Sequence, residues 1–342
     1  MPQITHDNHF VPQLYLKQWS TDGSRIWAYR TLVSHQKVKK WTLRSIRGVA
    51  FHQDLYTEIS DGQEVDDFER WMESEFETPA QEAIKKVVLE KVLEQSDWSK
   101  LAWFLAAQDV RTPISYLESM ERWNNTLPSL LQETLEDSVK RLEDLKNQNK
   151  TFEKTETINS LFSKSMKVNV VRNPDKKGGY IEAKVTLGRT LWIESQRFLL
   201  QKTAKALLNH KWGIAKPANG FEWFTSDHPV VRLNYYKKGL YDLKGGWGKT
   251  KGNLLMPLSP KHLLFTQIGE DVPDYFVFTK EKTIEIQKFI AERAFRWIFS
   301  KSPLRIIQKH RPCIVDEKLY KSEEENLKRW HKEQIQAEKS NY

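Results

Sequence analysis

The spacing of apolar residues changes along this chain, and that change limits the fold more than any other feature of the sequence. Between residues 64 and 145 apolar side chains recur every three to four positions, the period of an α-helix; the first such stripe contains Val65, Phe68, Met72 and Phe76. Beyond residue 220 short apolar runs alternate with polar turns, which predicts strands. We therefore expect an α+β fold that is dominated by helix and contains a small, mainly antiparallel sheet.

Capping residues predict where several helices begin. Thr78, three residues before Gln81, has the pattern of a capping box, so we expect a helix to start there. Ser96 is the expected N-cap of the next helix, and Pro113 should stop or kink it because proline has no backbone N–H. A fourth, strongly charged helix is expected over 130–145.

The remaining elements are predicted from local pattern alone. Apolar or alternating stretches predict strands at 26–29, 49–51, 168–171, 180–185, 221–224, 230–233, 254–256 and 263–265. Helical spacing predicts a helix over 189–210, a long helix that carries Ile286 and Trp297, and a charged terminal helix over 316–337.

The length of 342 residues suits one large domain or two smaller ones. We expect a single domain over 1–342; because 146–165 is polar, the alternative is a division into 1–145 and 166–342. Cys313 is the only cysteine, which excludes a disulfide within the chain and a cysteine-based zinc site.

Charge and hydropathy restrict the partners. The chain has 54 basic and 45 acidic residues, a net charge of +9 that favours polyanionic partners such as nucleic acid or anionic lipid, although enzymes with small anionic substrates are often equally basic. The first residues lack the pattern of a signal peptide, and no apolar run approaches the ~20 residues that span a bilayer. We therefore expect a cytoplasmic protein with no membrane partner.

The segment 232–253 concentrates much of the positive charge, with six basic residues and one acidic residue. Aromatic residues are interleaved with the lysines, an arrangement that holds single-stranded nucleic acid by stacking and by phosphate contacts. The predicted nucleic-acid-binding residues are Tyr235, Tyr236, Lys237, Lys238, Trp247 and Lys249. The alternative is a solvated, mobile hairpin whose glycines only permit turns.

Two polar residues fall on an apolar helical stripe. Gln108 lies seven residues after Leu101 and Arg111 seven after Phe104, so both should face the core. An unpaired guanidinium or amide is costly to bury, so both groups must have partners. One interpretation is a substrate-binding fork for phosphate or carboxylate. The alternative is a structural network that ties this helix end to the Ser226–Asp227 turn.

His9 and Asp227 are the candidate catalytic residues. His9 precedes a predicted helix start, and neutral imidazole can act as a general base or a metal ligand. Asp227 follows Ser226 at the end of an apolar run, where catalytic and metal-binding carboxylates often lie. The alternatives are a packing or capping histidine and, at Ser226–Asp227, ordinary turn chemistry before Pro229.

A separate pattern imitates the metal nucleases. Asp175 is followed by Glu182 and Lys184, and in such enzymes two carboxylates hold Mg²⁺ while a lysine orients water. The spacing is short, and an acid two residues before a lysine arises by chance in so charged a chain. The cofactor is left open, with a divalent metal such as Mg²⁺ as the candidate.

Four short segments follow the order of a known family: HFVPQLYLKQW at 9–19, QDVRTP at 108–113, TSDHP at 225–229 and MPLSP at 256–260. With them the chain resembles the bacterial family catalogued as domain of unknown function number 4238, over most of its length. The resemblance implies a bacterial or phage-related accessory protein and, by association, a role in defence against phage. It also groups His9, Gln13, Gln108, Arg111 and Asp227 in one pattern.

Two functional hypotheses follow. In the first, the protein is a nuclease-like hydrolase that acts on nucleic acid or a nucleotide. Gln13, Gln108, Arg111 and Ser226 bind substrate beside the catalytic pair, and Arg111 holds phosphate. In the second, the protein is a non-enzymatic module that binds nucleic acid or another protein. The same polar residues are then structural, and the charged helices at 130–145 and 316–337 bind a partner protein.

Overall fold

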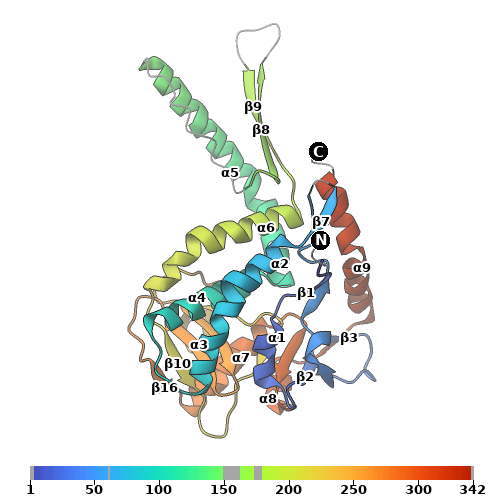
Figure 1. The fold of residues 1–342 in the computed structure, drawn as a ribbon, viewed down its shortest axis with the longest axis vertical. Helices are drawn as coiled ribbons and strands as arrows, with labels where there is room; N and C mark the ends of the chain where they lie inside the picture. Colours follow the sequence, from blue (N-terminus) through green and yellow to red (C-terminus); the bar gives the residue numbers. More distant parts are fainter. Residues whose placement is uncertain (1–3, 61, 149–161, 173–178, 340–342) are drawn as a thin grey trace.

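The computed structural model describes residues 4–60, 62–148, 162–172 and 179–339. Its architecture is α+β, as predicted, with helices on both faces of a central sheet (Figure 1). The sheet is larger than expected: it has six strands in the order β13-β12-β14-β15-β10-β16. These are β10 Gly213–Lys216, β12 Val231–Lys237, β13 Leu240–Asp242, β14 Asn253–Ser259, β15 His262–Gln267 and β16 Tyr275–Val277. All neighbours are antiparallel except β10 and β16.

A four-stranded sheet joins the two ends of the chain. Its order is β11-β17-β2-β4, with β11 Thr225–Ser226, β17 Trp297–Ser300, β2 Arg25–Arg30 and β4 Trp41–Ser45. Four two-stranded sheets complete the set: β1 Asp7–His9 with β5 Phe51–Gln53, β3 Leu32–Val33 with β18 Ile314–Val315, β6 Glu58–Ser60 with β7 Gln63–Val65, and β8 Met166–Arg172 with β9 Gly179–Val185.

Several predicted elements differ from the structure. Val65 of the first helical stripe lies in β7, and of the predicted strand 49–51 only Phe51 is in a strand, β5. The run 221–224 is not a strand, although Trp223 and Phe224 are fully buried. Its backbone groups bond singly to distant residues: Trp223 N–H donates to the Pro260 carbonyl, and the Trp223 carbonyl accepts from the Trp19 indole. Trp297 is not helical but lies in β17, opposite Arg30.

The helical segments before residue 90 include one continuous stretch, α2–η3–α3, where a break at Thr78 was predicted. They comprise α1 Gln13–Leu16, the 3₁₀ turns η1 Lys17–Trp19 and η2 Ile46–Gly48, α2 Asp67–Met72, the π turn η3 Glu73–Glu77 and α3 Thr78–Val88. Thr78 is not an N-cap, because Glu77 before it already has helical dihedral angles (φ −80°, ψ −52°). The sequence pattern of a capping box is present there, but the chain enters α3 from η3 and needs no cap.

The long helices begin at α4 Gln95–Val110. Its cap is a box formed by Glu94 and Asp97, not Ser96. Pro113 ends this helix as predicted, and it also occupies the first turn of α5 Pro113–Asn147, where a missing N–H costs nothing. Beyond these lie α6 Arg189–Phe198, η4 Leu199–Thr203, η5 Ala204–Asn209, α7 Lys280–Arg293, α8 Arg305–His310 and α9 Glu317–Lys339.

The core lies on both faces of the six-stranded sheet because side chains along β14 alternate. Leu254 and Met256 pack into a cluster with α3 and α4, whereas Leu255 packs into a second cluster with α7. The distal part of α5 and the β8–β9 hairpin project from one end of this body (Figure 1). Within the described residues, no helix combines the length and the apolar character that a bilayer crossing requires.

Candidate functional site

Arg111, a predicted substrate-binding residue, is sealed in the interior at the end of α4, with 1% of its surface exposed. Its guanidinium forms an ion pair with Glu77 and donates a hydrogen bond of 2.6 Å to the main-chain carbonyl of His9. It also lies beside the ring of Tyr56, whose hydroxyl donates to the Arg111 carbonyl. The guanidinium is therefore fully engaged in joining α4 to η3 and to the N-terminal segment.

The other members of the predicted cleft lie around this network. Burial, together with the positive charge of Arg111, lowers the pKa of His9. Gln13 is half-buried in the first turn of α1. Gln108 is completely buried, and its amide N and O have no hydrogen-bond partner within the described residues.

Asp227 holds the chain before β17. Its carboxylate accepts hydrogen bonds from the backbone N–H groups of Phe295, Arg296 and Trp297 at 2.7–2.9 Å. Burial raises the pKa of Asp227 to about 6, against the opposing effect of these three donors. Ser226 donates to the carbonyl of His228 at 2.8 Å. These are turn contacts, and both side chains are buried.

The predicted segments do meet, but not around a solvent-open cavity. Nδ1 of His228 lies 2.5 Å from the hydroxyl of Thr112, so the turn after β11 is tied to the junction of α4 and α5. Among the hydrogen bonds and ion pairs of the described residues, none joins His9 to Asp227. These contacts are of the kind that the structural-network interpretation expects.

A cleft of about 340 Å³ opens next to this network. It lies between the end of α4, the first turns of α5, the α6–η4 helix, the start of β12 and the loop 243–252. Its polar and aromatic lining consists of Asp109, Ser115, Glu118, Ser119, Arg122, Trp192, Ser195, Gln196, Thr203, Arg232 and Trp247. We refer to it as the Gln196 cleft.

Asp109 anchors one wall of the Gln196 cleft. Its Oδ2 accepts a hydrogen bond of 2.8 Å from the indole N–H of Trp247, which holds the loop 243–252 against α4. Its Oδ1 lies 3.5 Å from Nε of Arg232, beyond a normal hydrogen bond. The second contact of Arg232, to Glu118, is also 3.5 Å long. Arg232 is thus attracted to both carboxylates while its donors remain loosely engaged.

Gln196 lies on α6 and is 1% exposed, yet its amide N and O have no hydrogen-bond partner within the described residues. A buried polar group left in this state costs about 1–3 kcal/mol, and such groups are rare in native proteins. Gln196 is one of the residues that line the cleft, whereas the equally buried and unpartnered Gln108 is not.

The charged lining residues are balanced, with Arg122 and Arg232 against Asp109 and Glu118, and Arg293 adds a third guanidinium behind the cleft. Glu118 is shared by Arg293, at 2.7 and 3.2 Å, and by Arg232, so one carboxylate faces two guanidinium groups. Partial burial, followed by repulsion from Arg232, lowers the pKa of Arg122. The side chain of Arg122 is exposed at the mouth and lies 5.9 Å from the ring of Trp123. Cationic donors are therefore available for an anion.

Further unpartnered groups lie behind the cleft. Burial and the nearby Arg293 and Arg232 lower the pKa of His228 well below its usual value, so its ring is neutral. Nε2 of His228 and Nε of Arg293 both lack a hydrogen-bond partner within the described residues. Of the unpartnered buried polar atoms in the described residues, those of Asp109, Gln196, His228, Arg232 and Arg293 lie at or behind the cleft.

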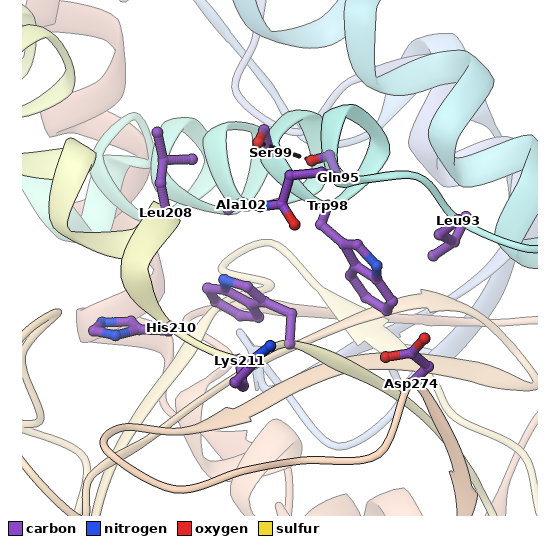
Figure 2. Close-up of a pocket in the computed structure, with 10 residues that line it drawn as sticks. Leu93, Gln95, Trp98, Ser99, Ala102, Leu208, His210, Lys211 and Asp274 are labelled. Atoms are coloured by element: carbon purple, nitrogen blue, oxygen red, sulfur yellow. Dashed lines mark hydrogen bonds between the residues drawn. The ribbon is translucent and has the colours of Figure 1, made fainter.

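A second hollow, of about 230 Å³, lies between the start of α4 and the chain after η5 (Figure 2). Trp98 points from α4 toward Asp274, while His210 and Lys211 line the opposite side (Figure 2). Its lining polar groups are already engaged or exposed: Ser99 donates to the Gln95 carbonyl, and Lys211 and Asp274 face solvent. His210 bonds to the Trp247 carbonyl at 2.7 Å, so this hollow backs onto the loop of the Gln196 cleft.

The predicted nucleic-acid-binding residues are split between the cleft and the hairpin β12–β13. Trp247 is 9% exposed and lines the cleft. Tyr235 is half-buried beneath Nζ of Lys282, 4.6 Å from the ring centre. Tyr236 is 58% exposed and is the one freely accessible ring of the hairpin. Lys237, Lys238 and Lys249 are exposed.

Metal ligands are not assembled in the part of the chain that the structure describes: it contains no group of three or more His, Cys, Asp or Glu side chains placed to hold an ion. Asp175 of the nuclease-like pattern lies outside the described residues. Glu182 and Lys184 form an ion pair of 3.4 Å on β9.

Sequence reasoning missed Asp109, Glu118, Arg122, Gln196 and Arg232 as site residues. A signal existed for Gln196, which falls four residues after Trp192 and four before Leu200, on the apolar stripe of its helix. Asp109 lies between Gln108 and Arg111, and only those two residues were singled out, because they fall on the apolar stripe. Glu118 and Arg122 carried no signal, because only the fold brings α5 against β12.

The family-model comparison agrees with the resemblance carried by the four short sequence segments. No curated protein and no solved structure matches the chain. A family model described as "Protein of unknown function (DUF4238)" matches residues 7–303. These residues include the Asp109, Glu118 and Gln196 walls of the cleft, as well as β12. The match covers most of the chain, and the protein therefore belongs to this family of unknown function.

Proposed function

We propose that the Gln196 cleft binds a nucleotide. The observation that carries the proposal is the buried, unpartnered amide of Gln196 at the wall of a cleft edged by Arg122 and Arg232. An amide presents a donor and an acceptor side by side, which matches the edge of a nucleobase. Arginine is suited to phosphate because its planar group donates two parallel hydrogen bonds.

Size and lining support the same ligand class. The cleft volume of about 340 Å³ lies at the lower end of the range for small-molecule sites, about 300–1,000 Å³. The indoles of Trp192 and Trp247 supply apolar area beside the polar groups, and the hydrogen bond that the Trp247 indole donates to Asp109 fixes the second indole in place. A flat, polar-edged ligand with an anionic group meets all three features.

The proposal concerns binding and not hydrolysis. Three backbone donors already occupy the carboxylate of Asp227, and the guanidinium of Arg111 is paired with Glu77. Neither group is free to activate water or to hold phosphate. A role in defence against phage, which the family resemblance suggests, remains a prediction.

Isothermal titration calorimetry with the four ribonucleoside monophosphates tests the proposal. We expect at least one to bind, and Gln196→Leu to weaken that binding roughly tenfold, the value of about one lost hydrogen-bonded edge. The free Gln196→Leu protein should unfold at an unchanged or higher urea concentration, because it no longer buries an unpartnered amide. Weaker binding together with lower stability would instead indicate a damaged fold.

A matched pair of arginines on α5 provides the charge control. Arg122→Gln removes a cation at the cleft mouth, whereas Arg141→Gln removes an exposed cation about 28 Å further along the same helix. We expect only the first substitution to weaken binding. Equal affinities for both variants and the wild-type chain would remove the phosphate contact from the proposal.

Binding of a partner protein is a second candidate, favoured by the distal part of α5. This part of the helix exposes Leu130, Val139 and Leu142, with 54%, 40% and 46% of their surface accessible. The other predicted docking helix, α9, is instead held to the body by pairs such as Arg189–Glu338 and Arg296–Glu323. If the protein binds none of the nucleotides, and if the Gln196→Leu and Arg122→Gln variants behave like the wild type, this second function is favoured.

A further inference from the structure

We infer that the nucleotide in the Gln196 cleft belongs to a single strand of nucleic acid, whose neighbouring phosphates lie along the outer edge of β12–β13. This inference rests on the proposed function. It adds a second contact area, defined by Tyr236, Lys237, Lys238 and Lys249, which we call the hairpin track.

The hairpin track is continuous with the cleft. Gly248 lines the cleft, and Lys249 follows it directly. Nζ of Lys249 lies 5.9 Å from the centre of the Tyr236 ring, which places the loop 243–252 against the hairpin. Lys237 and Lys238 come next in the chain after that ring. From Arg232 at the cleft to Lys237, β12 extends about 17 Å, longer than one nucleotide can cover.

The charge of the track is only partly offset, by Asp242 near Lys249 and by Glu281 near Lys238. Its three lysines are exposed and form no ion pair within the described residues. The one acidic residue of the segment, Asp242, is engaged by the backbone N–H of Lys244, by the Asn234 amide and by the Tyr236 hydroxyl. Exposed, unpaired lysines next to a cleft attract a polyanion better than a lone anion, because each phosphate contact releases a counterion.

One ring of the track is free to stack. Tyr236 is 58% exposed, and its hydroxyl lies 3.2 Å from Asp242, which orients the ring. Tyr241 cannot serve, because its ring packs 4.5 Å from Phe289 and its hydroxyl donates to Glu292. A stacking ring takes any unpaired base and rejects a base held in a duplex.

The depth of Gln196 also selects a single strand. At 1% exposure its amide can meet only a base that enters the cleft, and a base paired within a double helix cannot do so without being flipped out. The free base edge, the exposed ring and the unpaired lysines together specify unpaired nucleic acid. The cleft and track contact phosphate and base and do not themselves distinguish DNA from RNA.

Fluorescence anisotropy with labelled oligonucleotides of about ten residues tests the inference. The probes are single-stranded DNA, single-stranded RNA of the same sequence, and the DNA duplex, titrated between about 50 and 200 mM salt. We expect at least one single strand to bind more tightly than the mononucleotide measured by calorimetry, and more tightly than the duplex. A tighter RNA complex would assign the natural strand by its 2′-hydroxyl groups.

The deciding variant is Lys237→Gln/Lys238→Gln. We expect it to weaken oligonucleotide binding roughly tenfold and to reduce the slope of log K against log salt by about 1.4, the value for two lost phosphate contacts on a single strand. Mononucleotide affinity should be unchanged. The control is Lys328→Gln/Lys332→Gln, which removes two exposed charges from α9 and should alter neither measurement.

The outcomes separate the two proposals. Mononucleotide binding without tighter binding of either single strand, or an unchanged salt slope in the Lys237→Gln/Lys238→Gln variant, overturns the strand inference and leaves the nucleotide site standing. Preference for the duplex also overturns it. Absence of mononucleotide binding removes the proposed function, and the strand inference is then lost with it.

Discussion

At the residue scale, the buried polar side chains of this protein fall into two kinds, those with hydrogen-bond partners and those without. Arg111 and Asp227 are buried with protein partners: a carboxylate and a carbonyl for the guanidinium, and three backbone N–H groups for the carboxylate. Gln196 and Gln108 are equally buried, and neither amide has a hydrogen-bond partner within the described residues. The first kind stabilises the fold, whereas the second is costly unless something binds to it.

Removing Arg111 should therefore damage the fold. Arg111→Ala leaves the carboxylate of Glu77 and the half-buried Glu69 without their cation, so we expect the free energy of unfolding to fall by about 3–5 kcal/mol. Urea unfolding measures this loss. Arg305→Ala, an exposed arginine, is the control and should change stability little. A stable Arg111→Ala protein that had lost ligand affinity would return this residue to the binding site.

Glu69 gives the same network a pH dependence. Burial, opposed by Arg111, raises the pKa of Glu69 from 4.5 to about 7. The folded state therefore holds the proton more tightly than the unfolded state, and the stability contributed by this group falls as pH rises from about 4.5 to 7. Glu69→Gln should gain stability relative to wild type across that window, on the order of 1–3 kcal/mol at pH 8.

Urea unfolding of wild type and Glu69→Gln at pH 5 and pH 8 measures this gain. The exposed Glu75→Gln controls for loss of a nearby surface carboxylate. A difference between Glu69→Gln and wild type that shrinks as the pH rises would show that Glu69 is ionised and paired in the folded state.

At the scale of helices and strands, prediction worked where local pattern and packing agree. The apolar runs at 254–256 and 263–265 became β14 and β15, and Pro113 marked the junction of α4 and α5. In these places apolar spacing or a missing N–H decides the outcome without help from distant residues.

Prediction failed where distant residues decide the local structure. Trp297 continues the helical spacing of α7, but Asp227 binds the N–H groups of Phe295, Arg296 and Trp297, which a continuing helix would have used. Phe224 lies in a buried run that no neighbouring strand pairs. Neither outcome is encoded within a window of ten residues.

The cleft residues also divide into those that local sequence pattern reveals and those that depend on contacts between distant segments. Gln196 was detectable as a polar residue on an apolar stripe, by the reasoning that drew attention to Gln108 and Arg111. Its neighbours were not, because Arg122 and Arg232 are 110 residues apart in the chain and are ordinary exposed or half-exposed cations by themselves. A site made at the meeting of helices and a sheet becomes visible only with the pairings.

At the scale of the whole molecule, the two ends of the chain build the same layers. β2, within the first 30 residues, pairs with β17 at 297–300, and β3 pairs with β18. The largest core cluster likewise contains both Phe10 and Phe299. Contacts between the proposed halves 1–145 and 166–342 are therefore as central to the core as the contacts within each half.

This interleaving predicts that neither half folds alone. Without β17, the fragment 1–145 exposes one edge of β2 and loses the wall that Phe299 provides, while 166–342 loses the helices that cover Leu254 and Met256. Far-UV circular dichroism and tryptophan fluorescence in urea should give one coincident, cooperative transition for the full chain and none for either fragment. A steep transition in an isolated fragment, or two resolved steps in the full chain, would restore the division near 146–165. It would also mean that the Gln196 cleft, whose walls come from both halves, lies at a domain boundary and can open by movement of whole domains.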